Sequence, residues 1–160
     1  SVAVAAWVEK NASLSCASRA SMLAFIVAAA SAETTLQNGI TQTDDLAVGQ
    51  VKTYKLVLDV DAGAPDIQLV LTRLSGNPDL FASLSDPVPT SADSCAAPSC
   101  WSSTDAEGDV VQLPHTDPKL MECVKGASVG VPCKIHVAVI GVEASRFSLL
   151  VSAIKVGSGF

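Results

Sequence analysis

The sequence predicts an all-β protein, an antiparallel β-sandwich or jelly roll. Short runs alternate apolar and polar residues, turn-forming residues separate these runs, and no run shows a convincing amphipathic helix pattern. The stretch Gly76–Ser83 illustrates this, because Asn77 precedes Pro78 and so favours an extended or turn conformation. We expect the Asp79 side chain to close this turn and residues 80–84 to alternate as a strand.

Composition limits the possible partners. The chain has 160 residues, which suits one domain with a substantial core. Its net charge is −6, and its ten Lys and Arg residues are scattered. Nucleic-acid backbones are bound by clustered cations, so the composition excludes such a partner. No apolar run reaches the length of a transmembrane helix.

Residues 1–32 carry patterns that leave three interpretations open. The apolar run 23–32 ends in Ala-Ser-Ala, as the hydrophobic region and cleavage site of a signal peptide do. The block 20–29 also lines up with 144–153, which favours the last strands of a preceding, truncated repeat. A buried helix is the third alternative. Asn11 begins an Asn-Ala-Ser sequon for N-glycosylation.

We expect residues 33–160 to form one β-sandwich domain. A polar segment over 41–49 leads into a strand over 51–60, whose apolar face holds Tyr54, Leu56, Leu58 and Val60. Two further strands are expected over 67–74 and 80–84. A turn-rich region is expected over 85–109, a short strand over 110–113 and a second loop over 114–130. Strands over 135–140 and 147–154 are expected to form a closing hairpin.

Five cysteines indicate the compartment. Two close pairs fall in loops rich in Pro, Gly and Ser, and the simplest disulfide connectivity joins Cys95 to Cys100 and Cys123 to Cys133. Metal ligation is the alternative, but the spacings are not Cys-x-x-Cys and no His completes a pattern. Disulfides imply an oxidising compartment. Cys16 is left without a partner in this pattern.

The chain resembles the bacterial pre-peptidase C-terminal domain family and its eukaryotic repeat relatives over about residues 36–155. The resemblance rests on four segments in order: 76–82, 101–113 with Trp-Ser-Ser and Gly-Asp, Asp117-Pro118 before a cysteine, and the pair 135–141 and 145–151. Departures are Asn77 in place of an acid, and His136 and Ile140 in place of aromatic residues. The resemblance implies a β-sandwich module of secreted proteases and surface proteins, without its own catalytic machinery.

Candidate catalytic groups fit poorly with their surroundings. The segment 126–130 matches Gly-x-Ser-x-Gly around Ser128, but that motif needs a sharp strand-to-helix turn, and no helix is expected here. His115 and His136 are the two imidazoles, and neither has a sequence context that singles out a Ser and an Asp as partners. We therefore predict no enzyme activity and no catalytic residues.

Two weaker ligand sites are predicted. Acidic loops of β-sandwiches often supply the oxygen ligands of calcium, and Asp79, Asp105, Glu107 and Asp109 form such a set, although their spacing lacks the EF-hand pattern and turn formation and solubility explain them better. The sequence predicts no cofactor other than this calcium. Trp7 and Trp101 are candidate platforms for a sugar or peptide, but aromatic residues are scarce, so Trp101 is expected as a lid over the core, with the ligand platform as the alternative.

Together these features predict a non-catalytic, secreted or cell-surface module, one unit of a tandem array, that serves adhesion or the assembly of a surface or matrix. Its partners would be extracellular proteins or glycans and neighbouring repeats of the same chain. The alternatives are an accessory domain of a secreted peptidase and a carbohydrate-binding module.

Overall fold

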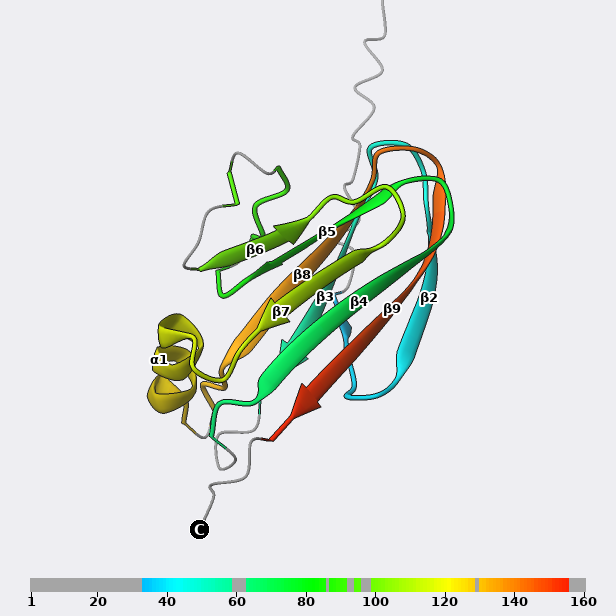
Figure 1. Ribbon diagram of the computed structural model, residues 1–160. Coiled ribbons are helices and arrows are strands. Elements are labelled where there is room, and N and C mark those ends of the chain that lie inside the picture. The colour runs from blue at the N-terminus through cyan, green and yellow to red at the C-terminus, as the bar shows by residue number, and fades with distance from the viewer. Residues whose placement is uncertain are drawn as a thin grey trace, which may run out of the picture. The chain divides into compact units, whose positions relative to one another are not determined.

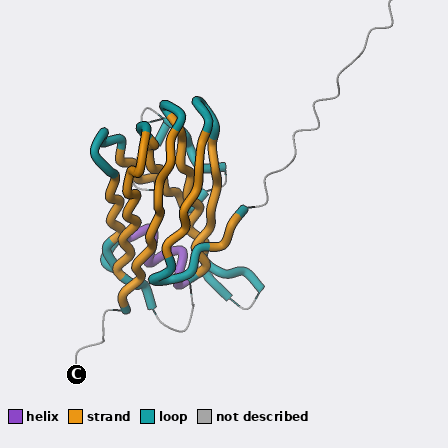
Figure 2. Tube along the Cα trace, turned by 90° about the vertical axis from the view of Figure 1, so that its right-hand side faces the viewer, coloured by secondary structure: helices purple, strands orange, loops and turns teal. Residues whose placement is uncertain are grey.

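The computed structural model describes residues 33–58, 63–85, 87–91, 94–95, 99–128 and 130–155. They form two sheets packed together as a sandwich, as Figures 1 and 2 show, so the predicted fold class is confirmed. The five-stranded sheet has the order β1 (Thr34–Thr35), β3 (Val51–Val57), β8 (Lys134–Gly141), β5 (Pro78–Ser83), β6 (Cys100–Ser103). The four-stranded sheet has the order β2 (Thr41–Leu46), β9 (Ser145–Ile154), β4 (Asp66–Ser75), β7 (Asp109–Leu113).

Nearly all of the strand pairing is antiparallel, and only β1 pairs with β3 in parallel. The main core lies between the sheets and comes from strand residues that alternate inward. Tyr54, Leu56 and Leu58 are buried on one face, as the sequence predicts. Val60 and all predictions for residues 1–32 lie outside the described residues.

The prediction of a closing hairpin is wrong. β8 pairs with β3 and β5, whereas β9 pairs with β2 and β4 in the other sheet. The short connection after Gly141 crosses between sheets, and a Cβ at Gly141 would lie 2.7 Å from the carbonyl oxygen of Ala47. The backbone therefore passes too closely at this corner for an ordinary side chain.

Two predicted loop segments contain strands. The polar lead-in 41–49 includes β2, whose inward Asp44 is satisfied by Lys52 Nζ and, at 2.9 Å, by the Tyr54 hydroxyl. These contacts join β2 of one sheet to β3 of the other, so a polar strand can face the core edge at low cost. The turn-rich segment 85–109 includes β6, an edge strand that pairs with β5.

The segment 114–130 contains a helix, α1 (Pro118–Gly126), and not only loop as predicted. Asp117 is its N-cap and accepts hydrogen bonds from the amides of Lys119 and Leu120, while Pro118 occupies the first turn. Leu120 and Val124, four residues apart, are buried. Within the described residues no helix is long and apolar enough to cross a membrane.

β5 is buried on both faces and does not alternate as predicted. Leu80 and Ala82 contact the main core, whereas Phe81 belongs to a second cluster with Val88, Cys95, Cys100 and Ala138. The loop after β5 thus covers the outer face of the five-stranded sheet. The alternation of residues within β5 could not reveal this covering, because it depends on how the following loop and Ala138 of β8 pack against Phe81.

Candidate functional site

Three of the acidic residues singled out in the sequence, Asp79, Asp105 and Asp109, lie at one edge of the sandwich, where β5, β6 and β7 meet. Asp109, at the start of β7, is fully buried. Its Oδ1 accepts hydrogen bonds from Ser103 Oγ at 2.9 Å and from the Asp105 amide at 2.6 Å. Its Oδ2 accepts from the Leu80 amide of β5 at 3.0 Å. One carboxylate therefore holds together two sheets and the connecting loop.

Asp79 lies on β5 next to this carboxylate and does not close the preceding turn as predicted. Its Oδ1 is buried without a hydrogen-bond partner, as is Oδ1 of Asn77. Burial raises the pKa of Asp79, and the negative charge of Asp109 raises it further. Burial also raises the pKa of Asp109, although its three hydrogen bonds oppose that change. The turn itself depends on Gly76, which has φ of 69°.

The calcium prediction gains no support from this geometry. Three of its four residues, Asp79, Asp105 and Asp109, come to the same edge, and Glu107 is exposed in the intervening loop. The described residues contain no group of three or more His, Cys, Asp or Glu arranged to hold a metal. Both oxygens of Asp109 already accept N–H or O–H donors, which a cation would displace. Calcium binding stays a prediction.

Trp101 lies on β6 opposite Ala82 of β5. Trp101 is partly buried and packs against the main core, as expected for a lid over the core. Sugar or peptide stacking on Trp101 stays a prediction.

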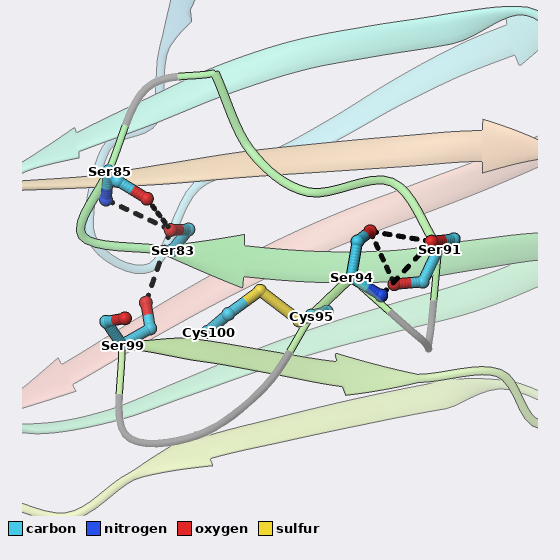
Figure 3. The surroundings of a disulfide bond; sticks show 7 residues. All are labelled: Ser83, Ser85, Ser91, Ser94, Cys95, Ser99 and Cys100. Carbon is cyan, nitrogen blue, oxygen red and sulfur yellow. Dashed lines mark hydrogen bonds between the residues drawn. A yellow bond between two sulfur atoms is a disulfide. The ribbon is translucent and has the colours of Figure 1, made fainter.

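Both disulfides form as predicted. Cys95–Cys100 anchors the loop that covers β5, and a set of serines ties the same loop down (Figure 3). Ser83 Oγ donates to the Ser99 carbonyl at 3.2 Å and accepts from the Ser85 amide at 3.0 Å. Cys123–Cys133 joins α1 to the residue before β8.

A groove of about 500 Å³ lies between these two disulfide-closed segments. Ser85 and Ser99 line it from the covering loop, and Lys119, Glu122 and Cys123 line it from α1. Lys119 and Glu122 bind each other at 2.8 Å across exposed positions. The two charged residues in the lining of this groove, Lys119 and Glu122, therefore neutralise each other, and the other lining side chains are neutral and cannot select a charged ligand.

The catalytic candidates are held in structural contacts. Ser128 forms an isolated β-bridge with Val131, and α1 precedes it where a nucleophile elbow needs a helix to follow. His136 Nδ1 lies 3.0 Å from Glu33 Oε1, and His115 Nδ1 lies 2.8 Å from Asp66 Oδ1. Asp66 was missed from the sequence, because it is 49 residues from His115 and only strand register brings them together.

No protein-family model matches the chain, and no curated protein matches it. Matching solved structures include the pre-peptidase C-terminal domain of a collagenase from Bacillus anthracis. The alignment covers 75% of this chain and 94% of that domain, with 9% sequence identity and a TM-score of 0.45. A similarity of this size assigns no function to this chain.

Proposed function

We propose that the chain is a non-catalytic extracellular module that binds other molecules at the surface or in the matrix. The observation that carries this proposal is the pair of disulfides, Cys95–Cys100 and Cys123–Cys133, each of which closes a loop segment outside the sheets. Such bonds persist in oxidising compartments. They rigidify surface loops, which lowers the entropy lost when those loops bind a partner.

His115, His136 and Ser128 are held in structural contacts, which supports a binding role over a catalytic one. A nucleophile needs a base within hydrogen-bond reach, and the base needs an orienting group. His115 and His136 each have a carboxylate neighbour, but within the described part of the chain neither forms a hydrogen bond with a hydroxyl or thiol. Ser83 is fully buried and occupied by loop contacts.

The proposal is tested with the full chain, secreted so that its disulfides form. Immobilised protein is presented to arrays of glycans and extracellular-matrix proteins and, in parallel, to ester, peptide and glycoside substrates. Saturable binding without turnover is the expected result. Turnover that disappears in His115→Ala or His136→Ala would overturn the proposal, and so would protein from its native compartment with reduced thiols at Cys95, Cys100, Cys123 and Cys133.

The same arrays test the carbohydrate-binding alternative. If Trp101 is a sugar platform, Trp101→Ala abolishes glycan binding while thermal stability changes little. If Trp101 is a lid on the core, the variant melts at a lower temperature and its binding per folded molecule is unchanged. The contact of Trp101 with the main core leads us to expect the second result.

A further inference from the structure

The outer face of the four-stranded sheet carries a groove of about 400 Å³ at the end where β4 begins and β7 and β9 end. Figure 1 shows these three strand ends side by side, at the same end of the sandwich as α1. Every residue that lines it lies within the described part of the chain: Asp66, Ile67, Gln68, Gln112, Leu113, Pro114, Ser152 and Ile154. It is separate from the edge formed by β5, β6 and β7.

Three side chains of the groove form one row across the sheet, here called the amide row: Ser152, Gln68 and Gln112. Gln68 is the register partner of both Ser152 on β9 and Gln112 on β7, so all three point to the same face. The side chains of Gln68 and Gln112 are exposed and make no hydrogen bond within the described residues. Neighbouring strands lie about 4.8 Å apart, so the two unpaired side-chain amides are close enough for one ligand group to reach both.

An anionic group ends the groove. Asp66 Oδ1 accepts hydrogen bonds from the His115 amide at 2.7 Å and from the His115 ring at 2.8 Å, which leaves Oδ2 free of contacts within the described residues. The hydrogen bond from the His115 amide lowers the pKa of Asp66 most, and the one from the His115 ring lowers it further. Asp66 is the one charged residue in the lining, and its side chain is 48% exposed. The groove therefore attracts a cation.

The remaining charges near this end do not cancel that attraction within the groove. Lys155 follows Ile154 but already has an interaction partner. Lys125 lines a different hollow with His115, on the side of α1. Asp117 caps α1. The His115 ring occupies Asp66 Oδ1, so Oδ2 is the oxygen left for a cation from a ligand.

Apolar surface flanks the polar groups on both sides. Ile154 is 63% exposed and Pro114 lies across the groove from it. One row further along the face, Val70 pairs with Leu150 and with Val110, and Val110 is 48% exposed. The face thus presents an apolar row, the amide row and a carboxylate in that order. The lining contains no aromatic ring, which disfavours a saccharide.

We propose that this groove binds an extended segment of a partner protein that carries an arginine, with an apolar residue two positions away. The guanidinium would donate to Asp66 Oδ2 and to the Gln68 or Gln112 carbonyl oxygen, since its fork of N–H groups suits several acceptors at once. The aliphatic part of the arginine would cover Ile154 and Pro114. The apolar neighbour would lie on Val70, because residues i and i+2 of a strand share a face.

This inference rests on the proposed function, a module that binds other extracellular molecules, and adds the chemistry of one ligand. Its test is a titration of ¹⁵N-labelled full chain with the peptide Ac-Val-Gly-Arg-NH₂, followed by NMR. Amide shifts are expected at residues 66–68, 111–113 and 152–154. The citrulline peptide, a neutral isostere of the arginine peptide, should bind at least about fivefold more weakly, the size of an exposed charge-assisted contact.

Matched variants locate the effect. Asp66→Asn keeps an acceptor for the His115 amide but removes the charge, and should weaken binding at least about fivefold. Gln112→Lys places a like charge in an exposed position and should abolish binding. Asp45→Asn is the control, since Asp45 is an exposed acid at the outer face of the same sheet and pairs only with Arg146 among the described residues. It should leave binding within about twofold, as expected for a distant screened charge.

Absence of shifts in the groove, or equal weakening by Asp66→Asn and Asp45→Asn, would overturn the inference. So would groove shifts caused by an oligosaccharide that are insensitive to Asp66→Asn. The arrays used for the proposed function separate the two failures. If the wild type and Asp66→Asn bind the same array partner equally, the groove assignment fails and the proposed function stands. If neither binds any partner, both fail.

Discussion

Asp109 connects three donors through a single carboxylate, and its replacement by Asn tests this role. Asn can accept from Ser103 and Asp105 at one oxygen but turns an amide donor toward the Leu80 N–H. We expect Asp109→Asn to lose about 2–3 kcal/mol of unfolding free energy in urea, the usual scale for charged hydrogen bonds. Glu107→Gln, in the exposed loop nearby, is the control and should change stability by less than about 0.5 kcal/mol. A rise in melting temperature with added calcium, lost in Asp109→Asn, would instead favour the cation site.

At the same edge, Asp79 makes stability depend on pH. Burial and then the charge of Asp109 raise the pKa of Asp79 above the value of about 3.9 expected when unfolded. Between the unfolded and the folded pKa of Asp79 the folded state binds more protons, so the free energy of unfolding falls as the pH rises through this range. Above the folded pKa the Asp79 carboxylate is ionised in both states, and the folded state bears the full cost of burying its charge near Asp109. Asp79→Asn should therefore raise the unfolding free energy at pH 7 and leave it nearly unchanged below about pH 3.5, where the carboxyl is protonated in both states.

Urea unfolding of Asp79→Asn at both pH values checks this sign. Asp45→Asn, at an exposed position, is the matched control. A loss of stability in Asp79→Asn at neutral pH would mean that the carboxylate is satisfied by a bound ion or water and is not a source of strain.

At the scale of elements, the turn between β4 and β5 depends on close backbone approach as well as on a positive φ. A Cβ at Gly76 would collide with the Ala144 carbonyl oxygen and lie 2.8 Å from Ser145 Cα. At Gly49, with φ of 71°, nothing lies within 4 Å. Gly49→Ala should cost about 1–2 kcal/mol of stability from backbone strain alone. Gly76→Ala should cost clearly more or prevent folding, and equal costs at the two sites would show that φ alone decides.

The helix α1 depends on its N-cap. Asp117→Ala removes the acceptor for the Lys119 and Leu120 amides and should cost about 1 kcal/mol of unfolding free energy. Asp117→Ser keeps a capping oxygen and is the control, with a loss near zero. Thermal unfolding followed by circular dichroism measures both. If Ala and Ser lose the same amount, the cap does not hold the helix and burial of Leu120 does.

At the scale of the whole molecule, the two disulfides differ in the length of chain that they close, 5 and 10 residues of sequence separation. Loop-closure entropy gives about 2 kcal/mol for Cys95–Cys100 and about 3 kcal/mol for Cys123–Cys133. Paired Cys→Ser variants, compared by urea unfolding under oxidising conditions, should show losses in that order. Loss of Cys95–Cys100 should also increase proteolysis of the loop over β5, whereas loss of Cys123–Cys133 should not.

Several features of the fold follow from local pattern. Alternation in β3 and β4 predicts their buried faces, because a strand has a period of two residues. The close spacing of Cys95 with Cys100, and of Cys123 with Cys133, predicts both disulfides. The start of α1 also has a local signal, Asp117 before Pro118, inside the segment 114–130 that the pattern predicts as a loop.

By itself, then, the sequence determined the strands with a clear alternation and the two disulfides, because each depends on residues close together in the chain. Only the tertiary structure decided that β8 and β9 belong to different sheets, that β5 is covered on both faces, and that Asp109 reaches Leu80. It alone placed Asp66, Gln68 and Gln112 in one groove. These features depend on strand register between distant segments, and register is set by packing of the whole core, which no local pattern contains.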